Sequence, residues 1–263
     1  MPDTQPAPQP LRPEPTGKGL LWAPAHRGQD YQNVLKTLHT VLRPRSYVEV
    51  GVETGMTLAL ATCASVGVDP AFKIGRDVTG AKPMLALRQC GSDEFFTSFD
   101  PRAWFGSDAV DFFFLDGMHL FEFLLRDFMN AERFSRPNSI IALHDCLPVD
   151  MYMTSRERGV SAYPPVHNAG WWTGDVWRLL PTLKKYRPDL RIHCLDAAPT
   201  GLVLVTGLDP RSTVLADRYG EIVAEGLALN LTEIGIQAFL DSLPVRSTAA
   251  YQAQADLAQH FWL

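Results

Sequence analysis

The sequence predicts an α/β domain built on a mostly parallel sheet that ends in an antiparallel hairpin. Short apolar runs alternate with amphipathic segments along residues 20–212, a pattern typical of a parallel sheet covered by helices on both faces. The run 110–115 (VDFFFL) is apolar in the manner of a strand buried on both faces. Residues 191–195 and 201–206 lie too close together for a crossover helix, so these two strands must pair antiparallel.

The individual elements follow from local patterns along the chain. A helix is expected over 31–43, with Asp30 as its N-cap. His39 falls on the face opposite its apolar side chains, so we expect His39 to be exposed to solvent. Residues 83–90 are ambiguous and are expected as a helix end that runs into a strand. Further strands are expected over 46–50, 65–68, 110–115, 139–143, 191–195 and 201–206, and helices over 56–64, 120–134 and 174–186.

The chain divides into three parts by composition. Residues 1–19 are rich in Pro and almost free of apolar side chains, so we expect a disordered tail. Residues 20–212 form the α/β domain. Residues 213–263 are expected as a C-terminal helical extension. Its apolar side chains are expected to cover a sheet edge or to form a homodimer with a second subunit: Ile234, Phe239, Leu240 and Leu243.

Composition excludes several classes of protein. The 263 residues carry a net charge of −5 with a pI near 5.8, which argues against a nucleic-acid binder. No apolar run reaches the roughly 18 residues of a membrane-spanning helix, and the N-terminus does not resemble a signal peptide. The four cysteines lie far apart, without a CxxC pair, as in a protein of a reducing compartment. We therefore expect a cytoplasmic protein without a membrane partner.

The first strand leads into a glycine loop of the form E-x-G-x-x-x-G, with Glu49, Gly51 and Gly55. This differs from the G-x-G-x-x-G loop that cradles a pyrophosphate, and the carboxylates of Glu49 and Glu53 suit a cationic ligand instead. Asp69 follows the second strand, where an acid can bind both ribose hydroxyls. A cationic ligand with a ribose and no phosphate is S-adenosylmethionine. The alternative is a simple turn with an acidic helix cap.

A second group of polar residues follows the strands 110–115 and 139–143. Asp116 and His119 come after the first of these strands, and His144 and Asp145 after the second. The carboxyl ends of parallel strands border the ligand crevice, and unpaired charges are costly to bury there. We expect the four side chains to share a cation, a hydrogen-bond network or a substrate. The alternative is that Asp116 caps the next helix and His119 lies in its first turn.

These motifs together resemble those of a known family. Over residues 47–210 the chain resembles class I S-adenosylmethionine-dependent methyltransferases, and especially the small-molecule O-methyltransferases with a D-G-x-H and an H-D motif, here Asp116–His119 and His144-Asp145. The resemblance implies a Rossmann-like, doubly wound sheet of seven strands in the order 3-2-1-4-5-7-6. It also implies that the cofactor is bound by Glu49, Gly51, Gly55, Asp69, Ser92, Asp93 and Asp116.

The expected chemistry is methyl transfer to a poorly nucleophilic hydroxyl. We predict His119 as the general base, because imidazole accepts protons near neutral pH. Asp116 and Asp145 are the other catalytic candidates, and with His144 they are candidate ligands of a divalent cation. Metal-dependent relatives carry a third acid beside Asp145, whereas His144 and Cys146 flank it here. This change favours Mn²⁺ over Mg²⁺ and leaves metal dependence open.

The expected function is therefore an S-adenosylmethionine-dependent O-methyltransferase acting on a small hydroxylated metabolite, such as a sugar or natural product. The alternatives are a phenol or amine acceptor, or a non-catalytic cofactor-binding module on the same fold. The long segment 147–173, with Arg156, Arg158, Trp171 and Trp172, is expected to be a lid or an acceptor-binding surface. Alternatively, its two tryptophans pack against the next helix.

Overall fold

The computed structural model describes residues 20–263 and contains one mixed sheet, so the tail expected over 1–19 lies outside the described residues. In this part of the chain the strand order is β3-β2-β1-β4-β5-β7-β6-β8, and β7 runs antiparallel to both β5 and β6. The predicted fold class, strand order and terminal hairpin are confirmed. The strands are β1 (Ser46–Val50), β2 (Ala64–Val68), β3 (Leu85–Arg88), β4 (Phe112–Leu115), β5 (Ile140–His144), β6 (Arg191–Leu195), β7 (Leu202–Thr206) and β8 (Val245–Arg246).

The predicted number of seven strands is wrong, because the described sheet has an eighth. β8 lies inside the segment that was expected to be helical, and it pairs parallel with the edge strand β6. The amide of Asp196, just beyond β6, donates to the carbonyl of Arg246 over 2.9 Å. This short pairing covers backbone groups at the end of β6 that an open edge would leave to solvent.

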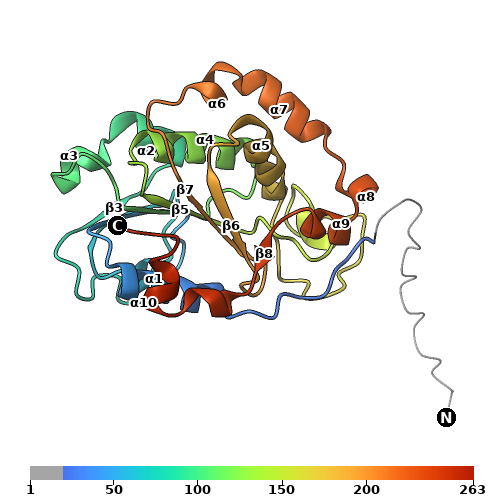
Figure 1. The fold of residues 1–263 in the computed structure, drawn as a ribbon, viewed down its shortest axis with the longest axis horizontal. Coiled ribbons are helices and arrows are strands. Elements are labelled where there is room, and N and C mark those ends of the chain that lie inside the picture. The colour runs from blue at the N-terminus through green and yellow to red at the C-terminus, as the bar shows by residue number, and fades with distance from the viewer. Residues whose placement is uncertain (1–19) are drawn as a thin grey trace, which may run out of the picture.

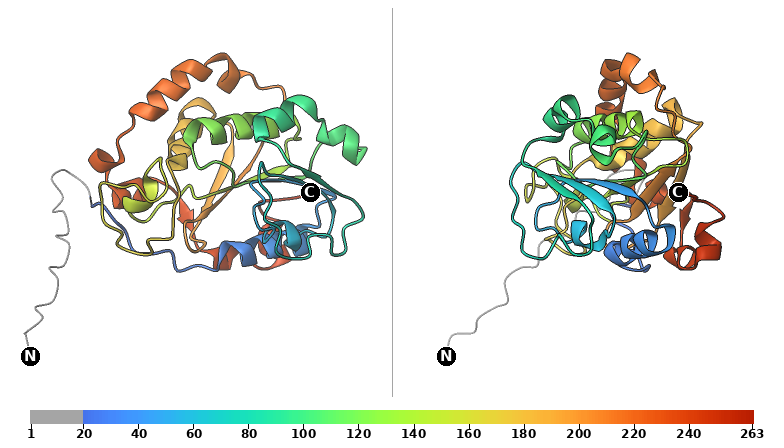
Figure 2. Two further views of the ribbon diagram at one scale, coloured as in Figure 1. Left: turned by 180° about the vertical axis from the view of Figure 1, so that it is seen from behind. Right: turned by 90° about the vertical axis from the view of Figure 1, so that its left-hand side faces the viewer.

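Helices cover both faces of the sheet (Figures 1 and 2). One face carries α1 (Tyr31–Leu42) and α10 (Gln254–Leu257), and the other carries α2 (Ser92–Ser98), α4 (Phe121–Arg133), α5 (Leu179–Tyr186) and α7 (Tyr219–Ala228). In β4, Phe113 and Leu115 join one apolar core while Phe112 and Phe114 join the other. The remaining helices are α3 (Pro101–Phe105), α6 (Val214–Asp217), α8 (Leu231–Ile234) and α9 (Ile236–Asp241).

The helix predicted over 56–64 is wrong, because only Leu58–Leu60 forms a short 3-10 turn. Two side-chain contacts account for the difference. The hydroxyl of Thr57 donates to Glu49 over 2.6 Å, and the ammonium of Lys82 donates to the carbonyl of Ala61 over 2.6 Å. Since β2 already begins at Ala64, the chain has no room to continue the turn into a helix.

The expectation that His39 faces solvent is also wrong. The side chain is 4% exposed, and its ring centroid lies 4.7 Å from that of Tyr47 and 5.1 Å from that of Phe112. Neither ring nitrogen has a hydrogen-bond partner among residues 20–263. Burial lowers the pKa of His39 to about 3, so the ring is neutral in the folded protein.

The N-terminal segment that precedes α1 crosses the carboxyl edge of the sheet. Backbone hydrogen bonds join Ala23 to Val149 and Tyr31 to Ala198, with lengths of 2.8 and 2.9 Å. This crossing brings Tyr31, the first residue of α1, to the loops that follow β4 and β5. No helix within residues 20–263 has the length and apolar character needed to cross a lipid bilayer.

Candidate active site

The glycine loop packs directly against the end of β4. Gly51 has a φ of +89°, and a Cβ at this position would lie 1.9 Å from the carbonyl oxygen of Asp116. Glycine is therefore required both for the left-handed backbone and for the close approach. The amide of Asp116 donates to the carbonyl of Val50 over 2.9 Å, so the loop after β1 and the start of the D-G-x-H motif form one unit.

Asp69, at the end of β2, holds the far side of this loop. One carboxylate oxygen accepts from the amide of Glu53 over 2.8 Å, and the other accepts from the amide of Ala71 over 2.7 Å. Glu53 itself is exposed and pairs with Lys73 at 3.6 Å. Each oxygen of Asp69 retains a second lone pair, so the carboxylate can still accept from ligand hydroxyls.

Glu49 lies beneath the glycine loop rather than on an open surface. Its side chain is 0% exposed, and its two oxygens lie 2.6 Å from the hydroxyls of Tyr47 and Thr57, which donate to them. Burial raises the pKa of Glu49 to about 8, even though both hydrogen bonds favour the charged form. The negative charge expected at this position is therefore absent at neutral pH, because ionisation would require desolvating a carboxylate in the core.

Ser92 and Asp93 begin α2, beyond the end of β3. The Asp93 carboxylate forms an ion pair with Arg126 of α4 at 2.8 Å, and Arg126 also donates to the hydroxyl of Tyr219 over 2.7 Å. The next residue of α4, Asp127, is 2% exposed, and its Oδ1 has no partner among the described residues. Burial raises the pKa of Asp127 to about 7.

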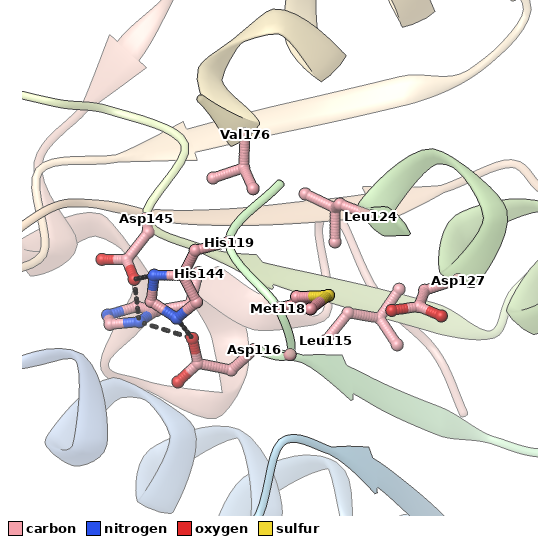
Figure 3. Close-up of a pocket in the computed structure, with 10 residues that line it drawn as sticks. Leu115, Asp116, Met118, His119, Leu124, Asp127, His144, Asp145 and Val176 are labelled. Atoms are coloured by element: carbon pink, nitrogen blue, oxygen red, sulfur yellow. Dashed lines mark hydrogen bonds and ion pairs between the residues drawn. The ribbon is translucent and has the colours of Figure 1, made fainter. Parts of the chain in front are cut away.

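The four polar residues at the carboxyl ends of β4 and β5 converge as the sequence predicts, with His144 as the last residue of β5 (Figure 3). Nδ1 of His144 lies 3.2 Å from Oδ1 of Asp116 and 3.4 Å from Oδ2 of Asp145. The His119 ring joins the same two carboxylates, with Nε2 3.4 Å from Asp116 and Nδ1 3.2 Å from Asp145. We refer to Asp116, His119, His144 and Asp145 as the Asp/His cluster.

Within the cluster each group stabilises the charge of its neighbours. Burial opposes ionisation of Asp116, but the His144 charge and hydrogen bonds from both imidazoles lower its pKa well below the usual range. Burial also favours neutral imidazoles, yet the two carboxylates raise the pKa of His119, and that of His144 well above its ordinary value. In the free protein the cluster is therefore a mutually compensated set of opposite charges.

Two residues at the cluster were not found from the sequence. The ring of Tyr31 lies 4.0 Å from that of His144, centroid to centroid. The hydroxyl of Thr200, in the turn before β7, donates to Asp145 and lies 3.5 Å from Nε2 of His144. Both come from segments far away in sequence, and no local motif marks either residue.

Part of the segment 147–173 covers the cluster. Trp172 stacks on the imidazole of His119, with ring centroids 4.8 Å apart and an interplanar angle of 6°. The Arg156 guanidinium, considered above for acceptor binding, pairs with Glu122 and with the buried Asp175, both at 2.5 Å. These contacts join the segment to the start of α4. The cavity beside the cluster has a volume of about 10 Å³, which corresponds to roughly one water molecule.

The cluster also contains the donors of a metal site. One ligand atom each from Asp116, His144 and Asp145 lie within 4.8 Å of one another. A cation held about 2.1 Å from each ligand needs donors roughly 3 to 4 Å apart. Nδ1 of His144 meets this spacing, at 3.2 Å from Asp116 and 3.4 Å from Asp145. The imidazole makes this donor set better suited to Mn²⁺ than to Mg²⁺.

A family model described as a methyltransferase domain matches residues 48–146, which contain the glycine loop and the Asp/His cluster. No curated protein matches the sequence at a significant level. Similar solved structures include the O-methyltransferase TomG from Streptomyces achromogenes, involved in tomaymycin synthesis and bound to S-adenosylmethionine. It is 15% identical, with 68% of this chain and 80% of that chain covered and a TM-score of 0.49.

Two further solved structures have comparable similarity. The O-methyltransferase from Bacillus cereus, in complex with S-adenosylhomocysteine, is 14% identical over 70% of this chain and 84% of that chain, with a TM-score of 0.49. A putative O-methyltransferase from Klebsiella pneumoniae is 15% identical over 71% of this chain and 84% of that chain, with a TM-score of 0.47. Residues 48–146 are thus similar to a methyltransferase domain, and the sheet around them has the strand order that the resemblance in the sequence implies.

Proposed function

We propose that this protein transfers the methyl group of S-adenosylmethionine to a hydroxyl of a small metabolite, such as a sugar or natural product. The observation that carries this proposal is the Asp/His cluster beside the glycine loop. The sulfonium methyl is already activated, so the enzyme must mainly align the acceptor and remove its proton. An aliphatic hydroxyl needs a base, and this cluster contains imidazole at the predicted transfer site.

We further propose that the cofactor lies over the glycine loop. Gly51 and Gly55 would border its methionine part with Glu49 supporting the loop from below, and Asp69 would bind the ribose hydroxyls. Ser92 and Asp93 would lie beside the adenine. Asp116 would lie next to the sulfonium, because its backbone packs on Gly51. The positive φ values of Gly51 and Gly55, +89° and +82°, support a backbone that admits a ligand closely.

In this mechanism His119 is the general base and takes the acceptor proton. Asp116 and Asp145 orient its ring through contacts at 3.4 and 3.2 Å. The acceptor oxygen then bonds to the methyl carbon while the carbon–sulfur bond breaks and its electron pair stays on sulfur. Asp116, His144 and Asp145 would hold a divalent cation, which would polarise the acceptor hydroxyl and offset the carboxylate charge that retains the His119 proton.

Calorimetric titration with S-adenosylhomocysteine tests the cofactor part of the proposal, and the expected result is one site per chain. Replacement of His119 by Gln is expected to lower turnover at least about 100-fold with nearly unchanged cofactor affinity. Retained activity in H119Q would reject its role as base. Absence of cofactor binding would favour the non-catalytic module.

The acceptor class and the metal need separate experiments. Methyl transfer to phenols or amines, but not to aliphatic hydroxyls, would favour the alternative acceptors. Activity that survives exhaustive chelation would reject metal assistance, whereas recovery with Mn²⁺ in preference to Mg²⁺ would support it. The division into 20–212 and 213–263, a homodimer through the C-terminal helices and a cytoplasmic location stay predictions.

A further inference from the structure

A cavity separate from the Asp/His cluster lies between α5 and the C-terminal helices α8 and α9. Its volume is about 370 Å³, which is within the usual size range of ligand pockets. Phe239 of α9 packs edge-on against Trp177, with ring centroids 5.4 Å apart. The apolar side chains that line the cavity are Trp177, Pro181, Leu229, Ile234, Phe239 and Leu243. We refer to this cavity as the α5/α9 groove.

The α5/α9 groove has a cationic rim. The charged side chains that line it are Lys184 and Lys185, both in the last turn of α5. Lys185 forms an ion pair with Glu225 of α7 at 2.5 Å. Lys184 instead donates to the carbonyl of Ser242 over 3.0 Å, and it forms no ion pair among residues 20–263. An occupant that carries both an apolar side chain and a carboxylate therefore matches this groove.

The described part of the chain begins beside this groove (Figures 1 and 2). The carbonyl of Leu20 accepts from the amide of Ile236, the first residue of α9, over 2.8 Å. Ile234 and Phe239, on either side of Ile236 in the sequence, both line the groove. Leu20 itself is 54% exposed. Residues 1–19 are therefore attached to the protein next to the α5/α9 groove.

The composition of residues 1–19 suits an apolar groove. The segment contains six prolines, and apart from Met1 its one large apolar side chain is Leu11. A segment of this kind has too little apolar surface for a core of its own, but Pro-rich segments bind existing aromatic-lined grooves as extended polyproline II helices. Because such a helix has three residues per turn, Leu11 and Glu14 would lie on the same edge of it and Arg12 on another.

The segment is also long enough to reach the groove. Leu11 lies nine residues before Leu20. At roughly 3.1 Å per residue this connection spans up to about 28 Å, more than twice the diameter of a helix. The covalent connection gives the segment an effective concentration in the millimolar range. A contact with a dissociation constant of about 1 mM, too weak to form between separate molecules at low concentration, would then be occupied about half of the time.

We propose that the α5/α9 groove binds the protein's own N-terminal segment, with Leu11 against its apolar floor and the Glu14 carboxylate at the Lys184 ammonium. Lys185 already pairs with Glu225, so Lys184 is the cation of the rim that remains for the segment. The proposal does not depend on methyl transfer, because no residue of the groove belongs to the proposed cofactor site or to the Asp/His cluster. A second copy of the chain is the other occupant that the test distinguishes.

Photocrosslinking in the full chain tests this contact. The photoreactive residue p-benzoylphenylalanine replaces Gln9, which leaves Leu11 and Glu14 intact, and the protein is irradiated at low ionic strength so that the ion pair is not screened. Mass spectrometry of the digested protein then locates the crosslinks. We expect crosslinks to Ile234 or Leu243 in a product with the mass of a single chain. Leu11→Ser, which changes only the segment, should lower the crosslink yield at least about threefold, because it removes the side chain that the groove would bury.

Charge reversal at the rim provides a matched test. Lys184→Glu should lower the crosslink yield about two- to fivefold, the effect expected of an exposed ion pair, and Glu14→Lys added to this variant should restore the yield. The control is Lys36→Glu, at an exposed position of α1 on the other face of the sheet, which should leave the yield unchanged. The proposal is overturned if no crosslink to the groove forms, or if the yield does not respond to Leu11→Ser and to the charge reversal. A product with the mass of two chains would overturn it equally, because a second copy would then occupy the groove.

Discussion

Replacement of the buried Glu49 by Gln tests the electrostatics beneath the glycine loop. Both oxygens of Glu49 receive a hydroxyl hydrogen bond at 2.6 Å, and the side chain is fully enclosed. Gln has the shape of the protonated acid. Its amide can accept a hydrogen bond from one of the hydroxyls of Tyr47 and Thr57 and donate one to the other. If Glu49 is neutral in the native state, the variant should keep the loop intact at pH 7.

The magnitude follows from the raised pKa. The shift from 4.5 to about 8 corresponds to about 5 kcal/mol, since one pKa unit is worth about 1.4 kcal/mol. In the unfolded chain the Glu49 carboxyl ionises above pH 4.5, whereas in the folded protein it stays protonated until about pH 8. The free energy of unfolding therefore falls as the pH rises from 4.5 towards 8 and becomes constant above that. The Gln variant lacks this loss. It should therefore be more stable than the wild type by about 3 kcal/mol at pH 7 and by somewhat more at pH 9.

Urea denaturation at pH 5, 7 and 9 measures this difference. The advantage of Glu49→Gln should be small at pH 5 and should grow with pH, whereas Glu53→Gln at the exposed loop position should show no such trend. Affinity for S-adenosylhomocysteine at pH 7 should stay within about twofold of the wild type. An advantage that does not vary with pH, or a tenfold loss of cofactor affinity, would refute the assignment of a neutral Glu49.

Two further substitutions test the core and the loop. His39→Phe should stabilise the protein by about 1–2 kcal/mol at pH 7, because it removes two unpartnered ring nitrogens from an aromatic pocket. The gain in stability should grow as the pH falls from 6.5 towards 3, because in this range His39 of the wild type is neutral when folded and takes up a proton on unfolding. Thermal melts at pH 7 and 5 measure the difference. Gly51→Ala should cost at least about 2 kcal/mol and abolish S-adenosylhomocysteine binding in calorimetry, because its Cβ would collide with Asp116. Gly80→Ala, which meets no atom within 4 Å, is the matched control.

The sheet could be predicted because the apolar pattern of each long strand reflects how that strand is buried. An apolar run such as Phe112–Leu115 has one stable position, at the centre of a doubly covered sheet. β8 has no such pattern, because a strand of only two residues forms through its pairing with β6 rather than through its own sequence. The turn at Leu58–Leu60 was missed for a related reason, since the contact between Lys82 and Ala61 joins residues from separate segments.

The sequence predicted those parts of the site that the order of the strands alone brings together. Asp116 and Asp145 follow neighbouring parallel strands, so their convergence is a consequence of the sheet order. Thr200 and Tyr31 reach the same place from a hairpin turn and from the start of a helix. Their positions depend on packing across the whole domain. The aromatic character of Trp172 was visible in the sequence, but its partner was not.

The charges that the sequence suggests around the site differ from those that the structure shows. In the sequence, five acids fall where a cationic cofactor, its ribose and a possible metal would lie: Glu49, Glu53, Asp69, Asp116 and Asp145. In the structure Glu49 is neutral through burial, Glu53 pairs with Lys73, and Asp116 and Asp145 are compensated by imidazoles. Binding of a cation beside the Asp/His cluster would therefore require the cluster to release imidazole protons. The groups that would bind a cation and the group that would accept the substrate proton are then one coupled set, since each proton lost from an imidazole frees carboxylate charge beside the reacting atoms.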